Sequence, residues 1–293
     1  MAKIIDGKSI SAQVRNEVHI ATSALTKETG IVPGLAVVLV GDNPASQVYV
    51  RNKQKAAKEI EMNPIDIKLP EDVSSSILKS KLDQLNNDDS VHGILVQLPL
   101  PGHLDEKSII RLINPMKDVD GLHPENVGLM LGGTPRFVPA TPLGIQQLLI
   151  RTDNSPSGKH VVVCGRSDIV GKPVASLLLQ KDTAANATVT ICHTGTADMG
   201  VITRQADILI AAVGRPEFIT ADMVSAGVVV IDVGINRKTD PSSKRGYRLV
   251  GDVDYVNVSE KASAITPVPG GVGPMTIAML LFNTMTAAKL SAN

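Results

Sequence analysis

The chain of 293 residues contains no tryptophan, and its aromatic residues make up only 2% of the total. Its core must therefore be aliphatic, as is common for parallel sheets that are covered on both faces. The sequence also lacks a secretory signal pattern at its start and any apolar run of about 18 residues. We therefore expect a cytoplasmic protein that does not span a membrane.

Neither sign of charge is in excess, because 29 basic residues balance 29 acidic ones. This balance argues against a nucleic acid or a membrane surface as the partner. The two cysteines, Cys164 and Cys192, form no C-x-x-C or Cys/His pattern and lie in apolar runs. We therefore expect neither a metal site nor a disulfide, and the expected partner is a small molecule.

Apolar runs alternate with segments of helical periodicity along most of the chain. Strands are predicted at residues 35–40, 65–68, 93–98, 161–164, 188–192, 208–211 and 228–232, and helices at residues 9–27, 45–61, 74–85, 105–113, 143–150 and 275–290. This alternation predicts an α/β fold with parallel sheets, and the length suggests two domains. Glycines and prolines predict a linker at residues 128–142, and the charged segment 236–249 predicts an exposed excursion or hairpin.

A glycine loop joins a predicted strand to a helix within residues 159–179, KHVVVCGRSDIVGKPVASLLL. Such a loop offers backbone N–H groups and the positive end of the helix dipole to a phosphate. The spacing of Gly165 and Gly171 differs from the usual G-x-G-x-x-G, so an ordinary strand-to-helix turn is the alternative for the loop alone.

The tip of the next strand favours one cofactor. A protein that binds NAD usually carries an acid about 20 residues beyond the loop. This sequence instead has His193, Thr194, Gly195 and Thr196 there, with no carboxylate. Together with Arg166, these hydroxyls suit a 2′-phosphate, so the sequence favours NADP over NAD in a Rossmann-like domain.

Three polar residues on the helix after the first strand, Ser46, Tyr49 and Lys53, are spaced three and four apart and so share one face. A lysine there can transfer protons if desolvation lowers its pKa. The alternative is a solvated lysine, because the same helix also carries Lys55 and Lys58. The spacing alone does not decide between the two.

Other polar groups follow predicted strand ends. Gln97 needs a partner at the end of a buried strand, or it caps the following turn. One of Asp118 and Asp120 can accept two N–H groups from a flat heterocycle, whereas an Asx turn is the alternative for that loop. We assign no role to His123 or His193, because lone imidazoles are more often structural.

Six stretches resemble, in order, the bacterial FolD family of bifunctional methylenetetrahydrofolate dehydrogenase/methenyltetrahydrofolate cyclohydrolases. They are VGDNPASQVYVRNK (40–53), GILVQLPLP (93–101), KDVDGLHPENVG (117–128), GRSDIVGKP (165–173), DVGIN (232–236) and TPVPGGVGPMT (266–276). The resemblance covers nearly the whole chain. It implies NADP-dependent oxidation of methylenetetrahydrofolate and hydrolysis of the methenyl product, within one-carbon metabolism, tetrahydrofolate interconversion and purine biosynthesis.

The resemblance also implies two sets of site residues. The folate set comprises Lys53 as the catalytic lysine, Tyr49 against the aminobenzoyl ring, Gln97 as the partner of the lysine, Asp120 at the pterin, and Gly271 and Pro274 in a loop that lines the cleft between the domains. The cofactor set comprises Gly165, Arg166 and Ser167 in the glycine loop, Thr194 at the 2′-phosphate and Ile235 at the nicotinamide.

The family's architecture implies a folate-binding catalytic domain at residues 1–142, completed by the returning helix at 272–293, and a Rossmann-like NADP-binding domain at residues 143–271. It also implies a homodimer that forms through the nucleotide domain. Glu61 stands where relatives usually have the glycine that ends the lysine helix. We therefore expect this helix to close without a left-handed cap.

Two other functions remain to be weighed. A different NADP dehydrogenase, acting on a hydroxy acid or a shikimate-like substrate, would need its own anion-binding arginines or acid–base pair, and we find none. A nucleotide-binding sensor that has lost catalysis would lack Lys53 or Asp120, and both are present.

Overall fold

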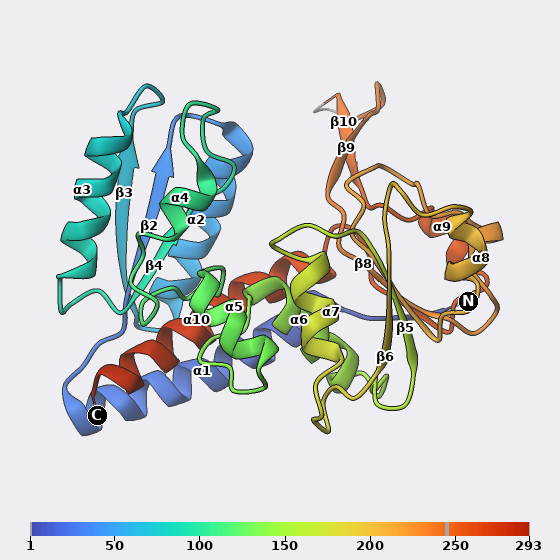
Figure 1. The fold of residues 1–293 in the computed structure, drawn as a ribbon, viewed down its shortest axis with the longest axis horizontal. Coiled ribbons are helices and arrows are strands. Elements are labelled where there is room, and N and C mark those ends of the chain that lie inside the picture. Colours follow the sequence, from blue (N-terminus) through green and yellow to red (C-terminus); the bar gives the residue numbers. More distant parts are fainter. Residues whose placement is uncertain (1, 244–245, 293) are drawn as a thin grey trace. The chain divides into compact units, whose positions relative to one another are not determined.

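The computed structural model describes residues 2–243 and 246–292, and the chain divides into two compact units. Unit 1 comprises Met1–Ser11 and Thr141–Thr276, and unit 2 comprises Ala12–Ala140 and Ile277–Asn293. Each unit has its own parallel sheet and its own hydrophobic core (Figure 1). The predicted α/β class with two sheets is therefore confirmed.

The sheet of unit 2 has three parallel strands in the order β3 (Asn63–Leu69), β2 (Gly34–Val40) and β4 (Gly93–Val96). The central strand β2 is buried along its whole length, because helices cover both faces of the sheet (Figure 1). The strand that was predicted to reach residue 98 ends at Val96, so that Gln97 lies directly after it. Polar side chains at this end of β2 and β4 therefore share one edge.

The helices of unit 2 include both long helices near the chain ends. They are α1 (Gly7–Thr29), α2 (Pro44–Glu59), α3 (Ser75–Asn86), α4 (Glu106–Ile110), α5 (Pro124–Leu131) and α10 (Val272–Ser291), of which α1 and α10 begin in unit 1. Within unit 2, Asn283 of α10 donates hydrogen bonds to the carbonyl oxygens of Val119 and Val138 over 2.8 and 2.9 Å. The predicted return of the C-terminal helix to the first domain is confirmed. None of the described helices is long and apolar enough to cross a membrane.

The linker predicted at residues 128–142 is wrong in part, because α5 occupies its beginning. Pro124 takes the first turn of α5, and Nδ1 of His123 caps the helix by accepting the N–H of Glu125 over 3.1 Å. Gly128 is inside the helix, where a glycine costs about 1 kcal/mol relative to alanine. The sequence did not reveal this helix because proline and glycine are also the residues most typical of loops.

The sheet of unit 1 has six parallel strands, whose order is β1-β11-β8-β7-β5-β6. Their bounds are β1 (Lys3–Ile4), β5 (His160–Cys164), β6 (Thr188–Cys192), β7 (Ile208–Ala211), β8 (Val229–Asp232) and β11 (Ala264–Ile265). The chain leaves β5 for β6 on one side and then places β7 on the other side of β5, which is the doubly wound pattern. The predicted Rossmann-like domain is confirmed, although the two-residue strands β1 and β11 were not predicted.

Short helices and one hairpin complete unit 1. They are α6 (Ala140–Arg151), α7 (Gly171–Leu178), α8 (Met199–Thr203), η1 (Ala221–Met223), α9 (Tyr255–Ser259) and the antiparallel strands β9 (Asn236–Thr239) and β10 (Tyr247–Val250). The predicted hairpin is thus observed, apart from residues 244–245, which lie outside the described residues. Cys164 and Cys192 are opposite each other in neighbouring strands, and both are buried free thiols.

The expected closure of α2 without a left-handed cap is wrong. Glu61 itself adopts the left-handed conformation, with φ of 61°. Its N–H donates to the carbonyl oxygen of Lys58 over 3.2 Å, and that of Met62 donates to Ala57 over 3.1 Å, which together form a Schellman motif. The helix therefore keeps the usual closure, but with a side chain where glycine is unstrained.

Replacing Glu61 by glycine should therefore stabilise the protein. Removing the Cβ from a left-handed position relieves about 1 kcal/mol of strain, whereas the hydrogen bond that the Glu61 carboxylate accepts from Ser23 Oγ over 3.3 Å is exposed and contributes little. Denaturant unfolding should give a higher unfolding free energy for Glu61→Gly than for the wild type. Glu61→Ala is the control, since it removes the bond to Ser23 but keeps the Cβ. Equal stability of the two variants would show that the cap is unstrained.

Candidate functional site

Helix α2 places three polar side chains at the carboxyl edge of the sheet in unit 2. Asn43 caps the helix, because its Oδ1 accepts the N–H groups of Ala45 and Ser46 over 3.0 and 3.2 Å. The predicted common face is largely turned inward. Ser46 and Lys53 are 4% and 8% exposed, whereas Tyr49 is half-exposed at the same face.

Lys53 is a buried lysine with one defined partner. Its Nζ donates to Oε1 of Gln97 over 2.9 Å. The amide nitrogen of Gln97 donates to the carbonyl oxygen of Leu98 over 2.7 Å, so the amide oxygen must face the lysine. On the same helix the side chain of Lys55 is 76% exposed. The alternative of a solvated surface lysine is therefore wrong for Lys53, and the two side chains that the resemblance pairs are hydrogen-bonded.

Burial changes the protonation of this pair of ionisable groups. Desolvation lowers the pKa of Lys53 below its ordinary value of 10.5, and the negative charge of Asp120 acts in the opposite direction. Desolvation raises the pKa of Asp120, while the charge of Lys53 lowers it. A lysine whose ammonium form is disfavoured can act as a proton acceptor nearer to neutral pH.

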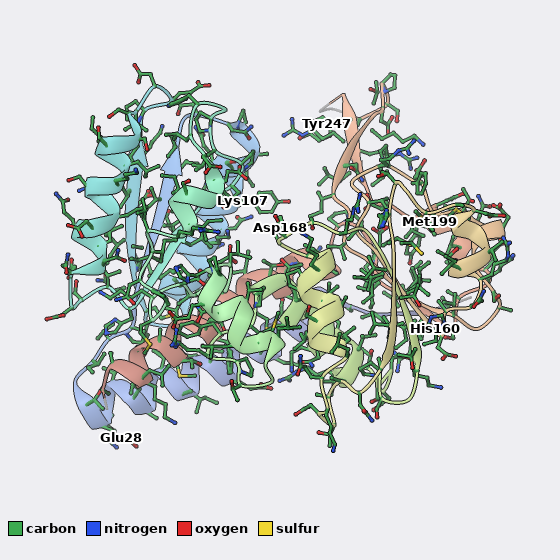
Figure 2. All side chains as sticks on the ribbon, viewed as in Figure 1. Glu28, Lys107, His160, Asp168, Met199 and Tyr247 are labelled. Atoms are coloured by element: carbon green, nitrogen blue, oxygen red, sulfur yellow. The ribbon has the colours of Figure 1, made fainter. Side chains whose placement is uncertain are left out.

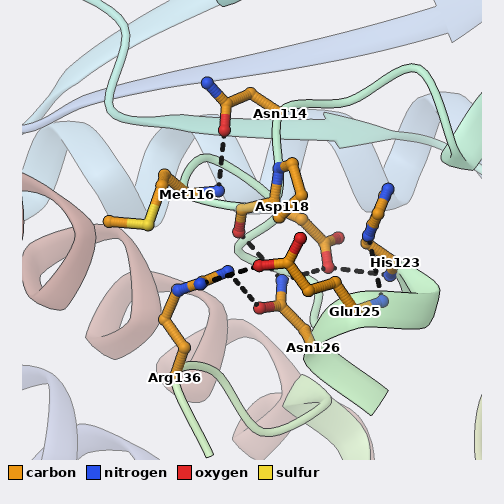
Figure 3. Close-up of polar contacts among 8 residues, drawn as sticks. Asn114, Met116, Asp118, His123, Glu125, Asn126 and Arg136 are labelled. Carbon is orange, nitrogen blue, oxygen red and sulfur yellow. Dashed lines mark hydrogen bonds and ion pairs between the residues drawn. The ribbon is translucent and has the colours of Figure 1, made fainter. Parts of the chain in front are cut away.

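The structure separates the roles of the two loop carboxylates, which the sequence left open. Asp118 is 1% exposed and accepts the N–H of Leu122 over 3.3 Å. It also accepts the N–H of His123 and Nδ2 of Asn126, both over 2.8 Å (Figure 3). Its oxygens thus close an Asx-type loop. By contrast, no hydrogen bond joins the Asp120 carboxylate to another part of the chain that the structure describes. Asp120 is therefore the acid that remains available to a ligand.

A second layer of contacts holds this loop in place (Figure 3). Asn126 is fully buried, donates from Nδ2 to the carbonyl oxygen of Pro115 over 2.9 Å, and accepts Nη1 of Arg136 over 3.0 Å. The same guanidinium contacts Glu125 at 2.8 Å through Nη2. The loop that carries Asp120 is therefore fixed by Asn126 in the first turn of α5, which Arg136 beyond the end of that helix holds in turn.

The glycine loop of unit 1 depends on two close backbone approaches (Figure 2 labels the neighbouring Asp168). A Cβ on Gly165 would lie 2.1 Å from the carbonyl oxygen of Ala212, and one on Gly171 would lie 2.3 Å from the carbonyl oxygen of Gly165. Between them, Oγ of Ser167 accepts the N–H groups of Val170 and Gly171 over 3.2 and 3.3 Å. Because only glycine fits at both positions, the turn brings the N-terminus of α7 close to the end of β5.

Two donors meet at the tips of β5 and β6. Nη1 of Arg166 lies 3.5 Å from Nε2 of His193, while Nδ1 of His193 accepts the N–H of Gly195 over 3.0 Å. Since Nδ1 accepts in this arrangement, Nε2 of a neutral ring carries the hydrogen. Two donors that face each other are suited to share an anion, and the neighbouring Thr194 is exposed. His193, to which the sequence assigned no role, therefore stands with Arg166 at a place that suits an anion.

The last three predicted site residues lie together in unit 1. The loop residue Ile235 is 43% exposed, and a Cβ on Gly273 would lie 3.5 Å from its Cδ1. Gly271 is buried, with room for no side chain, since a Cβ there would come within 2.7 Å of the carbonyl oxygen of Pro267. Pro274 follows in the first turn of α10. The start of α10 therefore lies against Ile235, in the loop that follows β8.

Sequence reasoning missed two buried carboxylates in the same unit, Asp232 and Asp252, which are 2% and 0% exposed. Asp232 ends an otherwise apolar strand and stands in the quoted motif DVGIN, so its position inside a buried strand was the available signal. Asp252 gave no such signal. Among residues 2–243 and 246–292, no group of three or more histidine, cysteine or acidic side chains could hold a metal ion.

Two family models match the chain. The catalytic-domain model of tetrahydrofolate dehydrogenase/cyclohydrolase matches residues 5–120, and the NAD(P)-binding-domain model of the same family matches residues 139–292. Among curated proteins, the chain is 60% identical over 284 residues to the bifunctional protein FolD of Chlorobium phaeobacteroides (strain BS1). That match covers 96% of this chain and 95% of the relative.

Solved structures are similar over the full length as well. The bifunctional enzyme FolD, methylenetetrahydrofolate dehydrogenase/cyclohydrolase, from Campylobacter jejuni matches with a TM-score of 0.92 and 48% identity over 99% of each chain. The FolD enzyme of Trypanosoma brucei, solved with NADP cofactor and an inhibitor, matches with a TM-score of 0.93 and 40% identity over 99% of this chain and 98% of that one.

Proposed function

Because the chain belongs to the tetrahydrofolate dehydrogenase/cyclohydrolase family, we propose how its own residues carry the two reactions of that family. The chain oxidises 5,10-methylenetetrahydrofolate with NADP and hydrolyses the resulting 5,10-methenyl cation to 10-formyltetrahydrofolate. The observation that carries the assignment of residues is the hydrogen bond between the buried Lys53 and Gln97. It supplies a desolvated amine at the edge of the folate-domain sheet.

Oxidation requires positioning rather than proton transfer by the protein. When bound, NADP supplies the acceptor for the hydride that leaves the methylene carbon. The adjacent folate nitrogens stabilise the cation that forms, so no side chain needs to remove a proton from that carbon. We assign binding of the pterin to Asp120, whose carboxylate is free to accept two N–H groups, and contact with the aminobenzoyl ring to the half-exposed ring of Tyr49.

Hydrolysis requires a group that handles protons. Water that attacks the methenyl carbon must lose a proton, and the adduct must then gain one on nitrogen before the ring opens. Lys53 is suited to both steps, because desolvation disfavours its ammonium form. As a neutral amine it still donates to Gln97 Oε1, which leaves its lone pair free to accept the water proton. Gln97 thus orients the amine and is a partner in catalysis.

The residues of unit 1 fit NADP. The close approach at Gly165 and Gly171 brings the N-terminus of α7 to the end of β5, where the positive end of the helix dipole favours a pyrophosphate. Arg166 and His193 present two donors for the 2′-phosphate, and Thr194 and Ser167 add hydroxyls beside them. No carboxylate stands at the tip of β6 to bind a free ribose diol, so NAD is the less favoured cofactor.

We also propose the functional division of the chain and its assembly. Residues 1–142 with 272–293 would bind folate, Gly271 and Pro274 would line that site, and residues 143–271 would bind NADP with Ile235 at the nicotinamide. A homodimer through the nucleotide domain is supported by β6, an edge strand on which Ile191 is 39% exposed. We also propose a cytoplasmic location and, from the family resemblance, a role in purine biosynthesis.

The replacement Lys53→Met separates the two activities. Methionine keeps the length of the side chain but cannot exchange protons, so hydrolysis of added methenyltetrahydrofolate should fall by about 100- to 10,000-fold. Oxidation should persist, and the variant should accumulate the methenyl species, which is followed by its absorbance. Lys55→Met, which removes an exposed lysine of the same helix, should leave both rates unchanged. Hydrolysis by Lys53→Met at the wild-type rate above the spontaneous background would disprove the assignment.

The replacement Arg166→Ala tests the cofactor site. Loss of a charge-assisted contact with the 2′-phosphate should weaken NADP by about 10- to 100-fold and leave NAD nearly unchanged, as measured by titration of each cofactor. Lys172→Ala removes another cation, from the first turn of α7, and should affect both cofactors alike. Equal losses for NADP and NAD in Arg166→Ala would contradict a 2′-phosphate contact.

A further inference from the structure

Unit 1 contains two buried carboxylates that the proposed mechanism does not use. Asp232, the last residue of β8, accepts the N–H groups of Gly234, Asp252 and Val253 over 3.0, 2.9 and 3.0 Å. Asp252 in turn accepts the N–H groups of Val213 and Gly214 over 2.7 and 2.8 Å, and Nδ2 of Asn236 over 2.8 Å. The two acids therefore connect three separate segments of backbone.

The surrounding chain makes room for these carboxylates. A Cβ on Gly251 would lie 1.7 Å from Oδ2 of Asp232, and one on Gly234 would lie 2.2 Å from Oδ1 of Asp252. Burial raises the pKa of Asp232 to about 7, and the charge of Asp252 adds to this effect. Backbone N–H groups, rather than cations, supply the hydrogen bonds that offset the desolvation of both acids. Burying two carboxylates costs free energy, and their hydrogen bonds fix the positions of the backbone segments that they join.

The loops that the pair fixes border the place where a dinucleotide binds a doubly wound sheet. Strand order reverses at β5, with β6 on one side and β7 on the other, and ligands occupy the crevice at the carboxyl ends of such strands. At this point a Cβ on Gly165 would lie 2.1 Å from the carbonyl oxygen of Ala212, and the N–H of Ala212 donates to the carbonyl oxygen of Cys164 over 2.8 Å. Val213 and Gly214, which Asp252 holds, come next in the chain. They directly follow the residue that lies against the glycine loop.

The direction of the cofactor follows from the anion site. If the 2′-phosphate lies between Arg166 and His193, the adenosine end is on the β6 side of β5. The pyrophosphate then lies at the N-terminus of α7, and the nicotinamide end extends toward β7 and β8. The loop after β7 hydrogen-bonds to Asp252 through Val213 and Gly214, and the loop after β8 is fixed at its end by Asn236, the first residue of β9, which also donates to Asp252.

We propose that Asp252, braced by Asp232, is a positioning residue for hydride transfer, because it fixes the two loops that hold the nicotinamide end of NADP. This inference rests on the proposed function. It predicts an effect on one reaction only. Lys53 and Gln97, to which we assign the hydrolysis, lie in unit 2, whereas the loops held by Asp252 lie in unit 1.

The test compares Asp252→Ala with Asp252→Asn in both assays. Alanine leaves three donors unpaired, and a displacement of the nicotinamide by about 1 Å is enough to lower the rate of oxidation roughly 100-fold. Hydrolysis of added methenyltetrahydrofolate should stay within about twofold of the wild type, since no acid–base group is lost. Asparagine keeps an oxygen for Val213 and Gly214, and Asn236 can turn its amide to pair with the new nitrogen. Asp252→Asn should therefore recover most of the oxidation rate.

Two further variants keep the test decisive. Asn236→Ala removes a single bond to Asp252 and should slow oxidation selectively even if Asp252→Ala fails to fold, which thermal unfolding would reveal. Asp118→Ala removes an equally buried acid from unit 2 and should raise the KM for folate in both assays without changing NADP affinity. Oxidation at the wild-type rate in Asp252→Ala, or equal losses of oxidation and hydrolysis in the folded variants, would overturn the proposal. A wild-type protein without one of the two activities would instead contradict the proposed function.

Discussion

The site of unit 2 depends on keeping the amine of Lys53 out of water. Burial of an ammonium group is unfavourable unless it is paired, and here the pairing comes from Oε1 of Gln97 and the nearby charge of Asp120. A different part of the fold positions each of these two partners. The parallel pairing of β2 and β4 brings Gln97 to the edge where α2 begins, and the Asx-type loop of Asp118 sets the position of Asp120. A basic amine with lowered pKa is the chemical result.

In both units a buried carboxylate that accepts backbone N–H groups fixes a functional loop. Asp118 closes the loop that carries Asp120, and Asp252 holds the loops after β7 and β8. Neither acid forms one of the ion pairs that the structure describes. A carboxylate with several backbone donors is specific for one loop geometry, because moving any donor leaves a buried charge poorly solvated. Rigid loops of this kind hold the reactants in the right geometry, so that a reaction which depends mainly on positioning needs few catalytic groups.

The sequence predicted the sheets well because apolar runs such as GLAVVLV of β2 have no other interpretation in an α/β chain. The sequence did not predict α5, because Pro124 and Gly128 lie in this helix although both residue types are typical of loops. It also failed at Glu61, since nothing in a sequence shows that a charged residue adopts a left-handed conformation. For the site, spacing found the face of Lys53, and polar residues after strands drew attention to Gln97 and to the pair Asp118 and Asp120. The resemblance supplied the roles of Gln97 and Asp120. The carboxylate pair of Asp232 and Asp252 joins residues 20 apart through tertiary contacts, which no local pattern reports.

The central claim is that a desolvated Lys53 accepts the water proton during hydrolysis. The most direct test is the pH dependence of methenyltetrahydrofolate hydrolysis, corrected for the spontaneous reaction, in the wild type and in Gln97→Glu. The wild-type rate should rise with pH through the loss of one proton, at an apparent pKa below the ordinary 10.5 of lysine. Glutamate in place of Gln97 puts a negative charge beside Nζ, which favours the ammonium form, so this rise should move to higher pH. An unchanged profile in Gln97→Glu would contradict the account.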